Sequence, residues 1–166
     1  DTTITPIDLG GFASEYFGTT DPLYDEMMKC WFIGLVMRVF QPGSKYDDCL
    51  TLRGGQGIGK STFFKIIAGE DNFNDTPQDK KNDLLTAINS CWLYEFAELE
   101  ATTSTKKVGD FKNLLSSAID LFRLPYHRSQ SRHKRTGVIC ASVNDAFFLK
   151  DETGSRRVLV VDLSHL

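Results

Sequence analysis

One short segment constrains this chain more than any other, because it matches the pattern G-x-x-x-x-G-K-[ST] of phosphate-binding loops. Its residues, called the phosphate loop below, are Gly54, Gly55, Gln56, Gly57, Ile58, Gly59, Lys60, Ser61 and Thr62. Backbone N–H groups in such a loop wrap a polyphosphate, and glycines allow the tight turns that this requires. We therefore expect the segment to bind ATP, with Lys60 on the β- and γ-phosphates and the Ser61 hydroxyl on Mg²⁺.

The residues on either side of the phosphate loop have the character that such a loop requires, a strand before it and a helix after it. Residues 49–53 form a short, mostly apolar run that predicts a strand. Residues 62–68 predict a helix that ends at Gly69, a typical C-cap residue. The unpaired N–H groups at the start of that helix would face the phosphates. The alternative is a solvated glycine-rich turn, and this context disfavours it.

Length and composition favour one compact domain, expected to be a module of a longer protein. The 166 residues are 41% hydrophobic, which suffices for a core. The most apolar stretch, residues 30–40, is too short to cross a bilayer and contains Arg38, and no signal peptide opens the chain. We expect a soluble, cytoplasmic protein that does not contact membranes. The four cysteines form no C-x-x-C pair, which argues against zinc and favours buried free thiols.

Strand and helix patterns alternate along the chain. A helix should begin at Asp21–Pro22, continue to Phe40 and stop at residues 41–43. Further helices are expected over residues 80–90 and along the apolar series from Phe111 to Phe122, and further strands within residues 71–76, 91–96, 137–143 and 157–163. The alternation predicts an α/β parallel sheet flanked by helices, a P-loop NTPase fold. Residues 1–45 should form a helical segment that packs on an ATPase core at residues 46–166.

A triphosphate site also needs carboxylates to hold the Mg²⁺ shell and orient the attacking water. The strand before residue 97 ends in Glu95-Phe96-Ala97-Glu98. Residues three apart on a straight strand face opposite sides, so both acids reach one metal only if the chain turns at Ala97. Glu98 is the stronger catalytic candidate. Glu95 could bind the metal or meet the nucleic-acid side, and a structural ion pair is an equally good interpretation.

Three polar residues follow or precede later strands. Asn144 directly follows the strand at 138–143, where its amide could bind the γ-phosphate and the attacking water together. An ordinary turn asparagine is the alternative. Arg156 and Arg157 precede the last strand, and either could offset charge on the transferring phosphoryl group, in its own chain or in a neighbour. For both arginines a solvated loop is an equally good interpretation.

A local positive charge stands out in a chain whose net charge is −3. Residues 121–135, called the basic run below, contain five Arg or Lys residues and two His, and no acidic residue follows Leu121 until after Asn144. Phosphate backbones attract such clusters, and aromatic side chains can stack on bases. A solvated loop or an anionic partner protein is the alternative. The nucleic-acid candidates are Arg123, Tyr126, His127, Arg128, Arg132 and Lys134.

Several of these segments together resemble the virulence-associated protein E family. They are Trp31-Phe32-Ile33, residues 40–43, 55–62, 92–99, 111–112 and 123–126, Asn144, and residues 150–157. The resemblance runs from about Trp31 to Leu163. The family comes from phages, prophages and mobile islands, and it is similar to superfamily 3 helicases and to the helicase parts of phage and poxvirus primase-helicases.

The resemblance implies an AAA+-like core in which an inserted strand separates the acidic strand from the phosphate-loop strand. It implies ring hexamers with ATP between subunits and single-stranded DNA in a central channel. By motif, Gly54, Gly59, Lys60 and Ser61 carry over as the phosphate loop, Glu98 with nearby Glu95 as the acidic motif, Asn144 as the first sensor, and Arg156 or Arg157 as the arginine finger. Lys112 and residues 126–134 lie where such helicases carry a DNA-contacting motif and hairpin.

We therefore expect an ATP hydrolase module of a phage-type DNA replication helicase. Lys60 and Mg²⁺ would offset phosphate charge, Glu98 would orient the water, and Asn144 would sense the γ-phosphate. An arginine from a neighbouring subunit would complete the site, so the isolated chain should hydrolyse ATP weakly. One alternative is a P-loop kinase in which the basic run forms a lid. Another is an ATP-driven DNA-loading or packaging-interference module that switches state without unwinding.

Overall fold

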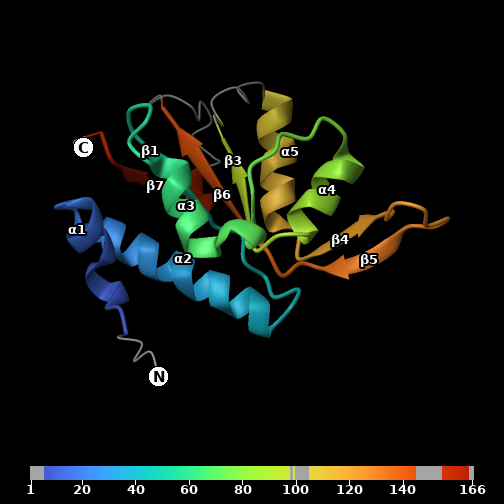
Figure 1. Ribbon diagram of the computed structural model, residues 1–166, viewed down its shortest axis with the longest axis horizontal. Helices are drawn as coiled ribbons and strands as arrows, with labels where there is room; N and C mark the ends of the chain where they lie inside the picture. Colours follow the sequence, from blue (N-terminus) through green and yellow to red (C-terminus); the bar gives the residue numbers. More distant parts are fainter. Residues whose placement is uncertain (1–5, 98, 100–104, 145–154, 165–166) are drawn as a thin grey trace.

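The centre of the molecule is a five-stranded, fully parallel sheet with the strand order β2-β3-β6-β1-β7 (Figure 1). The computed structural model describes residues 6–97, 99, 105–144 and 155–164. The strands are β1 Cys49–Arg53, β2 Phe73–Asn74, β3 Leu93–Phe96, β6 Val138–Val143 and β7 Val158–Asp162. Helices flank both faces of the sheet, and the predicted α/β fold is confirmed.

Helices α2 and α3 begin and end close to the residues that capping signals predict. The helices of the described residues are η1 Leu9–Gly11, α1 Phe12–Phe17, α2 Pro22–Phe40, α3 Lys60–Ala68, η2 Glu70–Asn72, α4 Lys81–Asn89, α5 Thr105–Ser116 and η4 Ser155–Arg157. At the start of α2 the Asp21 carboxylate accepts a hydrogen bond from the Leu23 N–H at 2.9 Å, while Pro22 fills the first helical position. At the end of α3, Gly69 has a φ of 77°, a conformation that glycine adopts readily.

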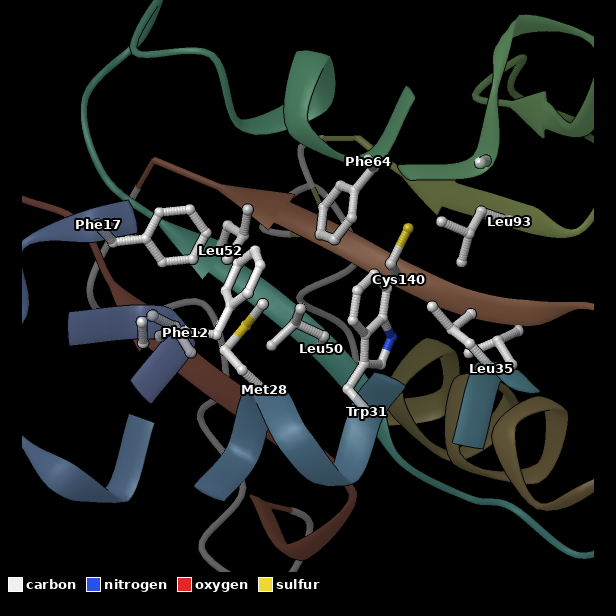
Figure 2. Close-up of a cluster of buried hydrophobic side chains, with 14 of the residues drawn as sticks. Phe12, Phe17, Met28, Trp31, Leu35, Leu50, Leu52, Phe64, Leu93 and Cys140 are labelled. Carbon is white, nitrogen blue, oxygen red and sulfur yellow. The ribbon is translucent and has the colours of Figure 1, made fainter. Parts of the chain in front are cut away.

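Helices α1, α2 and α3 cover one face of the sheet and bury an aromatic-rich cluster against it. Figure 2 shows Trp31 of α2 and Phe64 of α3 pointing toward each other over the sheet, with the two ring centroids 5.7 Å apart. Leu50 and Leu52 present alternate β1 side chains to this cluster. Each fully buried large apolar side chain stabilises the fold by about 1.5–3 kcal/mol. This packing fixes the position of the strand and helix that bracket the phosphate loop.

Helices α4 and α5 cover the opposite face (Figure 1). Their buried residues Ile88 and Leu115 join a second cluster with Ile139 and Val143 of β6. The sheet is therefore buried on both sides, which is the usual environment of parallel strands.

The predicted helix through Phe122 is wrong beyond Ser116. Residues Ile119–Phe122 form β4, which pairs antiparallel with β5, Ser131–Lys134, in a separate two-stranded sheet. In β4 the side chains alternate, with Asp120 and Phe122 buried and Ile119 and Leu121 exposed. The apolar residues of this segment recur at helical spacing and so predicted a helix. The alternation of a strand was not visible in the sequence, because one of the two buried positions of β4 holds the charged residue Asp120.

Asp120 is buried because Arg135 meets it at the base of this hairpin. The Arg135 guanidinium donates from Nε to Oδ2 at 2.8 Å and from Nη2 to Oδ1 at 2.5 Å. A second buried guanidinium, Arg38 of α2, donates to the backbone carbonyls of Tyr46 at 2.7 Å and Gly137 at 2.9 Å. Burial, together with the nearby charge of Arg135, lowers the pKa of Arg38 to about 10. The network joins α2, the hairpin and the start of β6.

The composition led to predictions about the cysteines and about membrane-spanning helices. Cys49, Cys91 and Cys140 are buried free thiols, but Cys30 is exposed on α2, so the prediction of burial is wrong for Cys30. Among the described residues, every helix is either too short or too polar to span a bilayer.

Candidate functional site

The phosphate loop joins the carboxyl end of β1 to the start of α3, as the sequence predicts. Gly57 and Gly59 have φ values of 84° and 93°, a conformation that side chains with a Cβ rarely adopt. The Gly54 N–H donates to the Val143 carbonyl at 3.2 Å, which anchors the loop to β6. Helix α3 has no side-chain cap at Gly59, so its first N–H groups point into the loop.

Lys60 lies at the centre of the loop and is buried. Its Nζ donates to the carbonyls of Gly54 and Gly55 and to Oδ1 of Asn144, each at 2.8 Å. A buried ammonium group needs such acceptors because it has left bulk water. The contact brings together two residues that the sequence predicts for one site, although they lie on different elements.

A buried carboxylate lies beside the loop on the neighbouring acidic strand. Glu95 of β3 accepts a hydrogen bond at Oε1 from the Ser61 hydroxyl at 2.8 Å. Within the described part of the chain, Oε2 has no partner at hydrogen-bonding geometry, although the Ser142 hydroxyl lies close enough to favour the charged form. Burial dominates and raises the pKa of Glu95.

Ser61 and Glu95 were both predicted Mg²⁺ ligands, and the structure brings them together. A hydroxyl and a carboxylate are oxygen ligands of the kind that Mg²⁺ prefers. A divalent cation would also offset the cost of a buried negative charge on Glu95. The residues present therefore fit a magnesium site. The catalytic candidate Glu98 lies outside the described residues.

The order of the strands explains how these groups meet. β6 lies between β1, which leads into the phosphate loop, and β3, which carries Glu95. Asn144 follows β6 directly and is exposed at its carboxyl end. In a parallel sheet all carboxyl ends lie on one edge, where ligands of such folds bind. The acidic strand and the phosphate-loop strand are thus separated by an inserted strand, as the resemblance implied.

An ion pair at the same edge was missed from the sequence. Arg53, the last residue of β1, donates to the carboxylate of its β7 partner Asp162. The hydrogen bond from Arg53 lowers the pKa of Asp162 to about 2. The available signal was weak, because it required knowing that β1 and β7 are neighbours. The pair joins β1 to β7 beside the first glycine of the phosphate loop.

The two candidate arginines lie at the opposite edge of the sheet. η4 immediately precedes β7, so Arg156 and Arg157 sit near the amino end of that strand. Val158 and Asp162 lie four residues apart, a span of about 13 Å at roughly 3.3 Å per residue. Arg157 pairs with Asp47, with 3.6 Å between Nε and Oδ2, while Arg156 is exposed. Neither arginine reaches the phosphate loop of its own chain.

The nucleic-acid candidates of the basic run lie on the β4–β5 hairpin and its connecting loop. Figure 1 shows this hairpin at the end of the molecule away from the loop that joins β1 to α3. The candidates Arg123, Tyr126, His127, Arg128, Arg132 and Lys134 are all exposed. Lys112 is half-buried on α5, and Arg135 is fully buried in its ion pair with Asp120. The run therefore contains one structural arginine and a set of exposed cations.

Comparison with known proteins points to one family. The model described as the virulence-associated protein E-like domain matches residues 6–165. No curated protein gives a significant match to the sequence.

Solved structures share the fold. The apo form of the NrS-1 C-terminal region aligns with a TM-score of 0.64 at 13% identity, over 98% of this chain and 40% of that chain. A JCV helicase structure aligns with a TM-score of 0.54 at 14% identity, over 93% of this chain and 44% of that one. The chain spans less than half the length of these proteins, and at such identities the likeness concerns the fold.

Proposed function

The chain belongs to the virulence-associated protein E-like domain family, and from this premise we propose that it is the ATP-hydrolysing module of a DNA replication helicase. The JCV helicase structure, which shares the fold, supports this class of function. The observation that carries the proposal is the convergence of four side chains, Lys60, Ser61, Glu95 and Asn144, on one edge of the sheet. Helix α3, strand β3 and the residue after β6 supply the groups that a magnesium triphosphate requires.

Each of these side chains has a distinct task in this proposal. Lys60 exchanges its loop carbonyl partners for β- and γ-phosphate oxygens and offsets their charge. Ser61 and Glu95 hold the metal, which when bound supplies further positive charge to the phosphates. Asn144, which already contacts Lys60, orients the γ-phosphate. Glu98 is proposed to orient the attacking water.

The arginine that completes the site comes from a neighbouring subunit. Arg156 and Arg157 lie a strand length away from the phosphate loop of their own chain. Because Asp47 holds Arg157, we assign the arginine finger to exposed Arg156. A ring, expected to be a hexamer, would bring this arginine to the next subunit's nucleotide. The isolated chain would then be a weak ATPase.

Single-stranded DNA is the proposed partner of the hairpin. Its exposed cations, among them Arg128, Arg132 and Lys134, carry charge in a part of the chain that lacks acidic residues. The position of the hairpin weighs against the kinase alternative, since the lid of a kinase would have to lie over the phosphate loop. The hairpin instead lies at the other end of the sheet (Figure 1). Strand displacement by the full-length protein would separate a helicase from a DNA-loading switch.

The test is ATP hydrolysis by the full-length protein with and without single-stranded DNA. Lys60→Ala should lower the rate on the order of 10³-fold, because it removes a charge that stabilises the transition state. Lys65→Ala is the matched control, since Lys65 is an exposed lysine of the same helix that pairs with Glu70. Hydrolysis that is unaffected by Lys60→Ala would refute the proposal. Stimulation by a small acceptor molecule rather than by DNA would favour a kinase.

A further inference from the structure

The outer face of the β4–β5 hairpin combines apolar and cationic side chains in register. Ile119 lies opposite Lys134, and Leu121 lies opposite Arg132. Ile119 is 39% exposed and Leu121 is 54% exposed, while both cations are exposed. One strand therefore presents an apolar row and the other a cationic row on the same open face. A solvated hairpin would be expected to carry polar residues at the two apolar positions.

The inner face holds this arrangement rigid. The rings of Phe122 and His133 stack, with their centroids 4.1 Å apart. Asn82 of α4 clamps the end of β4 through two reciprocal hydrogen bonds with the backbone of Arg123, at 2.9 and 3.0 Å. The buried pair of Asp120 and Arg135 fixes the base. A surface that is already ordered loses little conformational entropy when a ligand binds.

The loop between the two strands places a tyrosine in an unfavourable backbone conformation. Tyr126 has a φ of 66° and is fully exposed. It is the third residue of a turn closed by the His127 N–H and the Leu124 carbonyl at 3.1 Å. Since Pro125 cannot adopt a positive φ, this is a type II turn, where glycine or asparagine is preferred at the third position. A strained, solvated aromatic residue brings nothing to the core, which points to a role in binding.

We propose that this hairpin binds unpaired nucleobases as well as phosphates. Ile119, Leu121 and Tyr126 would contact the bases, and Arg132 and Lys134 would contact the backbone of a single strand. The ligand must be anionic to complement the basic run and must expose apolar faces to cover the apolar row. Single-stranded nucleic acid meets both conditions, whereas a duplex hides the faces of its bases. The inference rests on the proposed function and adds direct base contact to it.

The experiment compares two dye-labelled oligomers of equal length and charge, oligothymidine and an abasic strand, by fluorescence anisotropy with the full-length protein. Each stacked base strengthens binding on the order of tenfold, so the wild type should prefer oligothymidine by at least that factor. Tyr126→Asn and Leu121→Ser should each reduce the preference. Arg128→Gln should weaken both oligomers equally, and Tyr16→Asn, at an exposed tyrosine of α1, should change neither. An oligouridine arm distinguishes RNA from DNA.

The outcomes separate this inference from the proposed function. Equal affinity of the wild type for both oligomers overturns base contact and leaves binding by charge intact. A preference that survives both Tyr126→Asn and Leu121→Ser overturns the assignment to this face. If the wild type binds neither oligomer, nucleic-acid binding itself fails and the inference fails with it. Asparagine suits the turn, so the melting temperature of Tyr126→Asn should not fall, and a fall would contradict the argument from strain.

Discussion

Replacing Asp120 by asparagine should destabilise the fold strongly. The Asp120 carboxylate is buried and accepts hydrogen bonds from two nitrogens of Arg135, from Asn89 Nδ2 at 2.8 Å and from Ser117 Oγ at 3.0 Å. The asparagine side chain would be almost the same size, but it would leave the Arg135 guanidinium buried without a counter-charge. Arg38 would lose the same favourable charge, since Asp120 also raises its pKa.

The magnitude follows from the burial of both partners. Removing one member of a buried ion pair costs about 3–5 kcal/mol, because the remaining charge cannot be solvated. We expect the upper part of that range, since Asp120 pairs with Arg135 and its charge also favours the charged form of Arg38. For a chain of this length, 1 kcal/mol lowers the melting temperature by about 2–4 °C, so the full range corresponds to roughly 6–20 °C.

Urea denaturation followed by tryptophan fluorescence measures the loss, with Trp31 in the core as reporter. Asp110→Asn, at an exposed position of α5, is the matched control and should change little. Replacing both partners, as Asp120→Leu with Arg135→Met, should destabilise less than Asp120→Asn alone. If Asp120→Asn unfolds within about 1 kcal/mol of the wild type, the reasoning about this pair is refuted.

The pH dependence provides a second check on the same residue. Burial alone would raise the pKa of Asp120, but the hydrogen bonds and charge of Arg135 outweigh it, so the folded pKa is lower than the ordinary value of 3.8. A depressed folded pKa stabilises the protein above the unfolded value, and that contribution is lost as the pH falls through the folded pKa. The difference in stability between the wild type and Asp120→Asn should therefore shrink below about pH 4.

Further predictions concern the site and the core. Burial raises the pKa of Glu95, so the ionised Glu95 side chain destabilises the fold as the pH rises above 4.5. Glu95→Gln should therefore raise the free energy of unfolding at neutral pH, which urea denaturation measures. The same variant should weaken Mg²⁺-ATP binding, which a titration measures. Arg156→Ala should lower ATP hydrolysis by the full-length protein on the order of 10³-fold without altering ATP binding, whereas Arg157→Ala should cost less than about 1 kcal/mol of stability and spare hydrolysis. Gly34→Ala would drive a Cβ into the Tyr46 ring, so urea denaturation should show a loss of about 1–3 kcal/mol.

Local signals in the sequence were sufficient to predict the elements around the phosphate loop. The Asp21–Pro22 cap and Gly69 define helix ends through their own backbone and side-chain chemistry, so no distant contact is needed. The glycine pattern likewise predicts its own turn, and apolar runs predict the buried strands. The resemblance to a family predicted the order of β1, β6 and β3, which local patterns do not contain.

Long-range pairs could not be predicted in this way. Asp120 is buried beside Arg135, which lies fifteen residues later in the chain. This ion pair belongs to the hairpin in which residues 119–122 form β4 instead of the predicted helix. Arg53 and Asp162 are separated by 109 residues and become neighbours through the sheet register. The sequence predicts Ser61 and Glu95 only as ligands of a shared metal ion, and it does not predict the direct hydrogen bond between them. Charged residues whose ion-pair partners lie far away in the sequence produce no periodic pattern that would predict their burial.

A calorimetric titration of the protein with ATP in the presence of Mg²⁺ tests the role of the phosphate loop most directly. We expect saturable binding by the wild type and unchanged binding by Lys65→Ala. Lys60→Ala should weaken binding by about tenfold or more, because it removes a charged hydrogen-bond donor to the phosphates. Absence of binding by folded wild-type protein at millimolar ATP, or equal binding by Lys60→Ala, would contradict the claim that residues 54–62 hold a magnesium-bound triphosphate.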